Sequence, residues 1–401
     1  MADKKKILFV IDNLKIGGIQ KNMVNLLNSL CDTYEITLFI YNAVGEYLKQ
    51  VPENVKIVEA KSAFHLLGMS QSEAMKNPFT AIARTFFWLI LKFFGNKTLY
   101  KAMLLTQKNI GKFDYAVSGM QSAVAGVFFS GCNELILHKV DADEKITFVH
   151  CDWFECGVDN EYNRDIYRRM DKILVPYESN KNQLLKAFPE MEDRIFVINN
   201  FCNFDSIKEQ AKIDTVSYDE DKLNIVSVAR ISPEKGIDRA LRVMKRLKED
   251  GYSFTYHVIG GGGNYEELLN YVKDNDLDSY VYLHGYDANP YRYVVNADLI
   301  LLPSVHDAAP QVINEARSLG VPALSTDTIS AKEVIGNNSC GWVCENSEDG
   351  IYEGLKGILS DISVVRNKIK ELKNSICNND VAKKQFDDII KKEFLNYANY
   401  K

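Results

Sequence analysis

The chain has 401 residues, of which 46% are hydrophobic and 25% charged, a composition typical of globular rather than disordered proteins. Its 48 basic and 54 acidic residues give a net charge of −6. This argues against nucleic acid as the main partner, because phosphate backbones require clustered positive charge. The length suits two domains of ordinary size.

The first predicted element is a strand at residues 7–11, an apolar run too short for the core of a signal peptide. Gly17 and Gly18 follow in a tight loop that lets the backbone approach a ligand closely, although turns commonly use this pair. The next helix is expected to bury Met23, Leu26, Leu27 and Leu30.

The eight cysteines are scattered without zinc-finger spacing, so reduced thiols and a cytoplasmic location are expected.

A basic, aromatic-rich segment occupies residues 74–113, which contain seven basic residues and no acidic one. An apolar stripe at helical spacing is predicted within it: Phe79, Ile82, Phe86, Leu89, Ile90 and Phe93. Arg84, Trp88 and Lys92 line another face, and the two charges leave the apolar stretch too short to span a bilayer. Two interpretations remain open. The helix lies on an anionic membrane surface, or it is a core helix with a solvated basic edge.

The sequence TFVHCDW places His150 and Asp152 at the end of another predicted strand. Ligands of open α/β sheets bind beyond the carboxyl ends of the strands, so a role in binding is as plausible for His150 as a structural one. Residues 199–222 are polar and aperiodic, which predicts a linker. Two short acidic pairs are interpreted as surface turns rather than metal ligands: Asp141 with Asp143, and Asp276 with Asp278.

A second strand, loop and helix begin at residues 225–228. Arg230 and Lys235 lie on the loop, ahead of a helix whose predicted buried face is Ile237, Leu241, Met244 and Leu247. Two cations there suit a diphosphate, although a solvated basic loop is the simpler alternative. Four glycines at 260–263 follow the next strand without the Lys-Ser/Thr of a P-loop, which favours a tight turn.

The stretch SVHDAAPQVINEARSLGVP follows a predicted buried strand at residues 299–302. Pro310 is placed to open a helix, and Gly320 with Pro322 to end it. Val312, Ala316 and Leu319 are expected to face the core.

Glu315 falls within that apolar stripe, and an unpaired buried charge is costly. Either it forms a structural ion pair, or it accepts hydrogen bonds from ligand hydroxyls. Asp307 lies just before the helix, where exposed N–H groups favour anions.

Alternating strands and helices predict an α/β protein with parallel sheets. Near the end, an amphipathic helix is predicted that could cap either domain, with these apolar positions: Phe386, Ile389, Ile390, Phe394 and Tyr397.

Four motifs together resemble glycosyltransferases of family 4, above all bacterial members that build cell-surface polysaccharides. The motifs are GGIQ, FVHCDW, SVARISPEKG and LPSVHDAAPQVINEARSLGVP. The resemblance implies a GT-B fold, in which two doubly wound, Rossmann-like domains face each other across a cleft. Residues 1–203 would form the acceptor domain, 204–380 the donor domain, and 381–401 a helix crossing back to the first domain.

The resemblance also implies roles for single residues in the donor domain. Arg230 and Lys235 match the pair that neutralises the donor diphosphate, and Glu315 matches the acid that binds the nucleotide ribose. Asp307 matches the acid near the donor sugar hydroxyls. The family usually has Glu there, then glycine and a bulky residue, whereas this chain has Asp307-Ala308-Ala309, which leaves the donor sugar open.

Further matches lie elsewhere along the chain. Gly17 and Gly18 match a loop that approaches the donor phosphates, and His150 matches a histidine beside the donor sugar. Gly285 and Tyr286 belong to LHGY, the region whose backbone reads the base. Asp152 is an acceptor-side candidate.

The expected activity is that of a retaining, metal-independent hexosyltransferase that needs no cofactor. It would use a nucleotide-diphosphate sugar, with UDP expected, and a glycan acceptor on a polyprenyl diphosphate. Arg84, Trp88 and Lys92 are the candidates for contact with the inner membrane surface. Two alternatives stay open: a nucleotide-sugar 2-epimerase, and a non-catalytic protein that keeps the fold.

Overall fold

The computed structural model describes residues 4–391, with side chains up to Ile390. The chain forms two compact units, here named unit 1 and unit 2. Unit 1 contains the chain up to Phe201 and again from Asn379, and unit 2 runs from Cys202 to Asn378. These limits lie two residues before the expected boundaries at 203/204 and 380/381.

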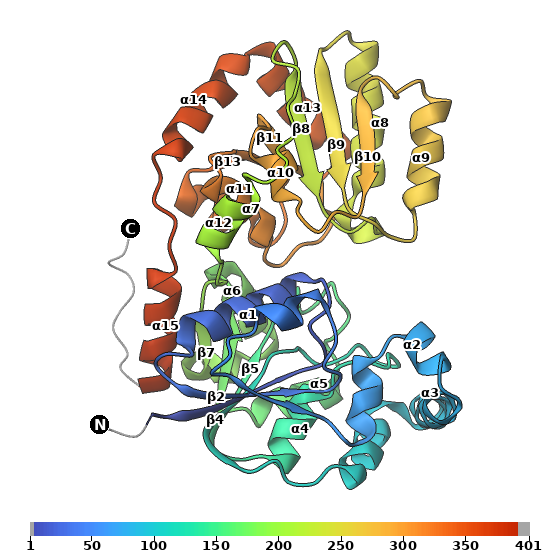
Figure 1. Cartoon of the computed structure of the whole chain (residues 1–401), viewed down its shortest axis with the longest axis vertical. Helices are drawn as coiled ribbons and strands as arrows, with labels where there is room; N and C mark the ends of the chain where they lie inside the picture. Colours follow the sequence, from blue (N-terminus) through green and yellow to red (C-terminus); the bar gives the residue numbers. More distant parts are fainter. Residues whose placement is uncertain (1–3, 392–401) are drawn as a thin grey trace. The chain divides into compact units, whose positions relative to one another are not determined.

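Unit 1 is built on a seven-stranded parallel sheet with the order β3-β2-β1-β4-β5-β6-β7 (Figure 1). Its strands are β1 (Lys6–Ile11), β2 (Glu35–Ile40), β3 (Lys56–Glu59), β4 (Lys112–Ser118), β5 (Asp141–Phe148), β6 (Lys172–Val175) and β7 (Ile195–Val197). The order runs outward from β1 in both directions, so right-handed crossovers put helices on both faces of the sheet. Figure 1 shows α1 (Gly18–Leu30) above the strands and α4 (Cys132–Lys139) below them.

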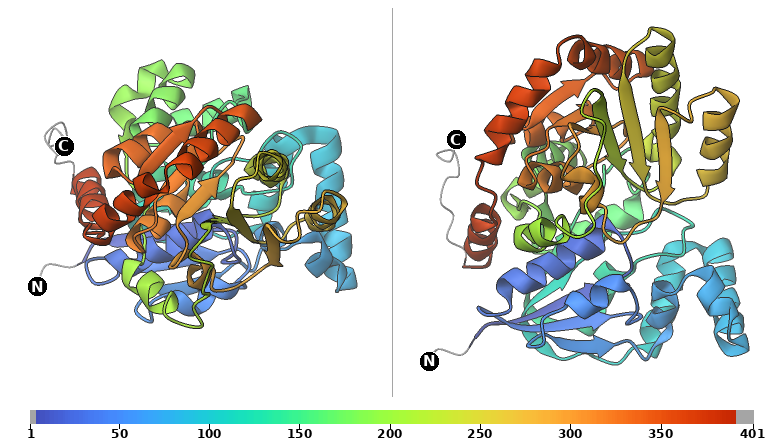
Figure 2. Two further views of the ribbon diagram at one scale, coloured as in Figure 1. Left: turned by 90° about the horizontal axis from the view of Figure 1, so that it is seen from above. Right: turned by 45° about the horizontal axis from the view of Figure 1, so that its top comes forward.

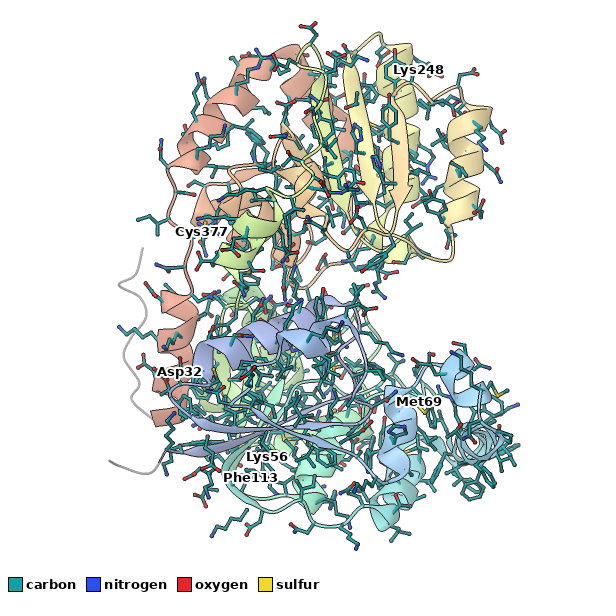
Figure 3. All side chains as sticks on the ribbon, viewed as in Figure 1. Asp32, Lys56, Met69, Phe113, Lys248 and Cys377 are labelled. Carbon is teal, nitrogen blue, oxygen red and sulfur yellow. The ribbon has the colours of Figure 1, made fainter. Side chains whose placement is uncertain are left out.

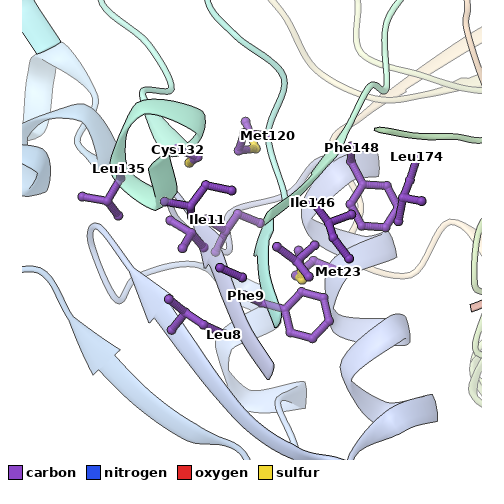
Figure 4. Close-up of a cluster of buried hydrophobic side chains, with 14 of the residues drawn as sticks. Leu8, Phe9, Ile11, Met23, Met120, Cys132, Leu135, Ile146, Phe148 and Leu174 are labelled. Atoms are coloured by element: carbon purple, nitrogen blue, oxygen red, sulfur yellow. The ribbon is translucent and has the colours of Figure 1, made fainter. Parts of the chain in front are cut away.

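Helices on both faces of the sheet bury β1 almost completely. β1 reads as an unbroken apolar run for this reason, with residues 7–11 inaccessible to solvent. In Figure 4, Phe9 of β1 lies near Met23 of α1, and Cys132 and Leu135 of α4 lie nearby. The predicted buried face of α1 is confirmed, because Met23, Leu26, Leu27 and Leu30 are all buried.

The remaining helices of unit 1 connect the strands or follow the sheet. The α-helices are α2 (Gln71–Met75), α3 (Pro78–Thr106), α5 (Glu161–Arg168), α6 (Glu178–Ala187) and α15 (Asp380–Lys391). The 3-10 helices are η1 (Glu46–Gln50), η2 (Ala63–Gly68) and η3 (Pro189–Arg194). β5 begins at Asp141, so the acidic pair at 141 and 143 lies within the strand, and the prediction of a surface turn there is wrong.

The C-terminal helix α15 packs into unit 1. Phe386, Ile389 and Ile390 are buried in its core, while the predicted positions Phe394 and Tyr397 lie outside the described residues. Polar bonds fix the helix: the Tyr34 hydroxyl donates to Asp387 at 2.7 Å, and Lys172 Nζ donates to the carbonyl of Ile389 at 2.6 Å.

Unit 2 contains a six-stranded parallel sheet with the order β10-β9-β8-β11-β12-β13. Its strands are β8 (Leu223–Val228), β9 (Phe254–Ile259), β10 (Val281–Gly285), β11 (Leu299–Leu302), β12 (Ala323–Thr326) and β13 (Gly341–Cys344). Its helices are α7 (Phe204–Gln210), η4 (Pro233–Lys235), α8 (Ile237–Glu249), α9 (Tyr265–Asp274), α10 (Tyr291–Val294), α11 (Gln311–Ser318), α12 (Ala331–Asn338), α13 (Glu348–Ser360) and α14 (Ile362–Lys373). The predicted face of α8 is buried in the core of this unit.

The segment expected to be an aperiodic linker is partly helical. Asn203 caps α7 by accepting a hydrogen bond from the backbone N–H of Ser206. Ile207 and Ala211 then pack against Tyr291 in a small apolar cluster of unit 2. The prediction failed here because two apolar residues four apart make too weak a periodic signal.

Candidate active site

The donor-side candidates lie on loops that follow β8, β9, β10 and β11 in unit 2. The carboxyl ends of parallel strands meet at one edge of a sheet, which brings these loops together. The loops are residues 229–236, 260–264, 286–290 and 303–310.

The glycine-rich loop after β9 packs directly against the loop that carries Arg230. The backbone N–H of Ile231 donates to the carbonyl of Gly261 at 2.9 Å. A Cβ atom at Gly260 would lie 1.8 Å from the carbonyl oxygen of Ala229, and one at Gly262 would lie 1.9 Å from that of Ile231. The predicted tight turn therefore has a packing cause: only glycine lets the two backbones approach this closely.

Lys235 and Asp307 form the central ion pair of this edge, with Nζ 2.6 Å from Oδ2. They are 72 residues apart in sequence, and backbone hydrogen bonds align their loops. The carbonyl of Glu234 accepts from the N–H of Val305 at 2.9 Å and from that of His306 at 3.3 Å. The pair thus puts a cation and a carboxylate side by side at the carboxyl ends of β8 and β11.

Arg239, at the start of α8, links the loop after β8 to the loop after β11. Its buried guanidinium donates to the carbonyls of Pro303 and Ser304, both at 2.7 Å, and to Asn346 Oδ1 at 2.7 Å. Burial lowers the pKa of this guanidinium from its ordinary value. The sequence analysis did not identify Arg239, because its partners lie more than sixty residues away and no local pattern marks them.

Arg230 lies on the same loop as Lys235 but is exposed to solvent. Its NH2 group is 3.3 Å from Glu234 Oε1, an exposed pair of the kind that contributes little stability. Its planar fork is therefore accessible for an anionic ligand beside Lys235.

Helix α11 places Glu315 in a buried position, as predicted. The helix begins one residue later than expected, with Pro310 as its N-cap, and Gly320 follows its end at φ 80°. The predicted core face needs correction, because Ile313 and Ala316 are fully buried whereas Val312 and Leu319 are only half-buried.

Ahead of α11, the carboxylate of Asp307 also accepts a hydrogen bond from the N–H of Ala309, at 3.3 Å from Oδ1. Ala308 is buried. One side chain thus shapes the turn into α11 and pairs with Lys235.

Gly285 and Tyr286 join this edge from β10. The N–H of Gly260 donates to the carbonyl of Gly285 at 2.8 Å, and a Cβ atom at Gly261 would lie 3.7 Å from Cβ of Tyr286. Tyr286 is exposed beside the glycine-rich loop.

The candidates of unit 1 lie at the carboxyl edge of its own sheet. Gly17 caps α1, and Gly18 opens it. The ring of His150 stacks on Phe148 with centroids 5.1 Å apart, and burial lowers the pKa of this imidazole to about 4, so it is neutral at neutral pH. Asp152 Oδ1 accepts from the backbone N–H groups of residues 154 and 155 at 3.2 and 3.0 Å, which ties it to the local turn.

The sequence analysis missed Asp12 at the end of β1. Its carboxylate is 4% exposed, and burial raises its pKa to about 6. It accepts from the N–H of Asn13 at 2.7 Å and from Gln20 Nε2 at 3.3 Å. An acid that ends a buried strand just before the Gly17-Gly18 loop was a usable signal.

Comparison with known proteins places unit 2 in a family. Residues 208–375 match the family model of glycosyl transferases group 1, and this range includes every donor-side candidate from Arg230 to Glu315. The chain is 28% identical over 89% of its length to the N-acetylgalactosamine-N,N'-diacetylbacillosaminyl-diphospho-undecaprenol 4-alpha-N-acetylgalactosaminyltransferase of Campylobacter jejuni, of which it covers 91%. It is 33% identical to the amylovoran biosynthesis glycosyltransferase AmsK of Erwinia amylovora, over 35% of this chain and 36% of that protein.

Solved structures agree at the level of the fold. TarM of S. aureus, bound to fondaparinux, alpha-GlcNAc-glycerol and UDP, aligns with a TM-score of 0.66 at 13% identity, over 96% of this chain and 99% of that one. Anabaena Alr3699/HepE in complex with UDP-glucose aligns with a TM-score of 0.64 at 13% identity, over 97% and 98% of the two chains. The chain is therefore a glycosyltransferase of the GT-B fold, and unit 2 carries its group 1 domain.

Proposed function

We propose that this enzyme transfers a hexose from a UDP-sugar to a hydroxyl of a lipid-linked glycan at the inner surface of the cell membrane. The observation that carries the proposal is the group formed by Lys235, Asp307, Arg230 and the start of α11 at one edge of unit 2. Two cations and a helix N-terminus can offset the two negative charges of a diphosphate.

The reaction breaks the bond between the anomeric carbon and the diphosphate oxygen, and forms one from that carbon to the acceptor oxygen. Negative charge develops on the leaving diphosphate, and fixed cations beside it lower the barrier. Lys235 and Arg230 are the residues proposed to stabilise that charge. Because they can do so themselves, we propose that catalysis needs no metal.

Asp307 is proposed to accept hydrogen bonds from hydroxyls of the donor sugar, since it lies within bonding distance of the cation assigned to the diphosphate. Glu315 is proposed to bind the ribose hydroxyls, the role that the resemblance to family 4 glycosyltransferases implies for this buried acid. We further propose retention of the anomeric configuration, with a diphosphate oxygen taking the proton of the acceptor hydroxyl. The neutral imidazole of His150 is proposed to contact the donor sugar, and Asp152 the acceptor.

The similar proteins support the donor and acceptor classes. TarM and HepE are solved with UDP or UDP-glucose, and the name of the Campylobacter relative specifies a sugar carried on diphospho-undecaprenol. Within residues 4–391, none of the helices combines the length and apolarity needed to cross a bilayer. Action on a lipid-linked acceptor would then require contact with the membrane surface.

The test is a thermal-unfolding screen of the whole protein against UDP, GDP, ADP and their sugars, with and without EDTA. A ligand present at 100 times its Kd stabilises the folded state by about 2.7 kcal/mol. We expect UDP and one UDP-sugar to raise the unfolding temperature, with no effect of EDTA. A shift only with another nucleotide, or only without EDTA, would contradict the proposed donor or the proposed metal independence.

A further inference from the structure

An exposed aromatic face on α3 has no part in the proposed transfer reaction. α3 contains a break at Gly95, whose φ of 76° and ψ of 177° are not helical. After the break, Leu99, Tyr100 and Met103 are buried in unit 1. Before it, only Phe87 and Leu91 of the helix are buried. The half before Gly95 is here named the α3 arm, residues 78–94.

The predicted apolar stripe of the α3 arm points into solvent rather than into the core. The exposed large apolar side chains are Phe79, Ile82, Phe86, Trp88, Leu89, Phe93 and Phe94, and Met75 precedes them. Of the predicted stripe, only Ile90 is half-buried. This excludes the alternative of a core helix with a solvated edge, because the apolar side is the solvated one. Figure 2 shows α2 and α3, in light blue, at one margin of unit 1.

Seven large apolar side chains are exposed on this half of the helix, and five of them belong to the predicted stripe: Phe79, Ile82, Phe86, Leu89 and Phe93. A contiguous exposed apolar surface of this kind marks an interaction site. The charge around it identifies the partner. Residues 74–113 hold seven basic and no acidic residues, and all of the basic residues except Arg84 are exposed. Lys92 Nζ lies 5.0 Å from the centre of the Trp88 ring, so a cation and an amphipathic aromatic ring lie next to each other. We infer that the α3 arm inserts its aromatic face into the headgroup region of an anionic lipid bilayer.

Arg84, predicted as a membrane-surface residue, has another role in this surface. Its NH1 group donates to the carbonyl of Leu66 at 2.6 Å and to that of Met69 at 3.0 Å, and its guanidinium lies 4.6 Å from the centre of the Phe128 ring. Arg84 therefore fastens the arm to the body of unit 1. Met69, labelled in Figure 3, marks this junction.

The segment around Met69 also contacts the loop after β1, which lies at the same edge of the sheet as the candidate residues of unit 1. The carbonyl of Gly68, next to Met69, accepts from Asn13 Nδ2 at 3.3 Å, and Lys15 forms an ion pair with Glu73 of α2. Asn13 and Lys15 belong to the loop between β1 and Gly17. An arm fixed in the bilayer would thus hold this loop near the membrane, where a lipid-linked acceptor presents its glycan. This inference rests on the proposed function only for the identity of that acceptor.

The test is sedimentation of the whole protein with vesicles of phosphatidylcholine and phosphatidylglycerol, with no nucleotide or acceptor present. The main variant is Phe79→Ser/Phe86→Ser/Phe93→Ser, whose side chains are 83%, 57% and 69% exposed, so folding should be unaffected. The matched control removes three exposed apolar side chains elsewhere, Ile213→Ser/Ile376→Ser/Val381→Ser, which are 57%, 84% and 54% exposed. Thermal unfolding checks both.

We expect wild type and control to bind anionic vesicles equally, and the Phe variant to bind at least about 100-fold more weakly, since each buried aromatic ring is worth about tenfold or more. Replacing Lys76 and Lys92 by Gln should weaken binding about fivefold per residue, and binding should fall with salt. Trp88 fluorescence should shift to the blue on binding, and a Trp88→Phe protein should lose that shift while still sedimenting.

Three results would overturn the inference: no binding of the wild type, equal loss in the control, or full binding of the Phe variant. The last would indicate a purely electrostatic contact. Because the assay contains neither donor nor acceptor, its failure is distinguishable from failure of the proposed function. A protein that is stabilised by UDP but ignores vesicles would keep the proposed donor chemistry and lose the membrane arm.

Discussion

Replacing Lys235 by Ala removes the cation that lies closest to Asp307, and the structure sets the size of two separate effects. The Lys235 and Asp307 side chains are 23% and 15% exposed, and their charged atoms are 2.6 Å apart. Exposed pairs contribute at most about 1 kcal/mol, whereas breaking a fully buried pair costs about 3–5 kcal/mol. We therefore expect the free energy of unfolding to fall by about 1–3 kcal/mol, which leaves the protein folded.

The effect of Lys235→Ala on catalysis should be larger. Removing one group that stabilises developing charge typically lowers kcat by ~10²–10³. The assay is release of UDP from the UDP-sugar that stabilises the protein most, measured with acceptor present. Both kcat and the affinity for UDP should fall, because the diphosphate is bound in the ground state as well as in the transition state.

Two further variants separate this effect from general damage to unit 2. Lys245→Ala removes a partly exposed lysine of α8 whose Nζ lies 3.9 Å from Glu249 Oε1, and it should change activity by less than about twofold. Asp307→Asn keeps Lys235 but loses the carboxylate, so it should lower turnover while UDP still binds. A folded Lys235→Ala protein with near wild-type kcat/KM would refute the assigned role of Lys235.

Two other predictions concern residues that position the site. Arg239→Ala should lower the free energy of unfolding by about 2–4 kcal/mol, because the carbonyls of Pro303 and Ser304 lose a charged donor; an unchanged urea midpoint would contradict this. For His150, the pKa is about 4 in the folded protein, against about 6.5 in the unfolded chain, so the unfolded state binds the extra proton between these values. The free energy of unfolding should accordingly not depend on this group above pH ~6.5, and should decrease as the pH falls towards 4. His150→Gln should remove the contribution of His150 to this decrease. Urea midpoints measured at several pH values test both expectations. Parallel pH dependences of wild type and variant would show that His150 is not the group concerned.

The fold was predictable because its signals are local and repeated. Residues 7–11 are a continuous apolar run, and residues 225–228 are apolar except for Ser227. Each is followed by a glycine-bearing loop and a helix with an apolar face, as in doubly wound sheets. The helix boundaries were less exact, and α7 was missed because so short a helix leaves almost no periodic signal.

The sequence predicted the candidate site residues, but not the contacts that hold them in place. Asp307 and Lys235 were each recognisable from their own loops, yet nothing local indicated that they form an ion pair. Arg239 illustrates the reason. Its role comes from carbonyl groups on a loop that only the β8–β11 pairing brings close, and sequence periodicity carries no information about such a partner.

For the α3 arm, the sequence pattern predicted the apolar stripe correctly but did not determine whether that stripe faces the protein core or lipid. Helical spacing identified the apolar stripe, but a stripe facing a protein core and one facing lipid have the same period. The residues that decided the matter lie on the other side of the helix. Phe87 and Leu91 are buried and Arg84 bonds to the carbonyls of Leu66 and Met69, so that side already faces the body of unit 1. Apart from the half-buried Ile90, the stripe itself is exposed, from 41% at Leu89 to 83% at Phe79, and it therefore meets whatever surrounds the protein.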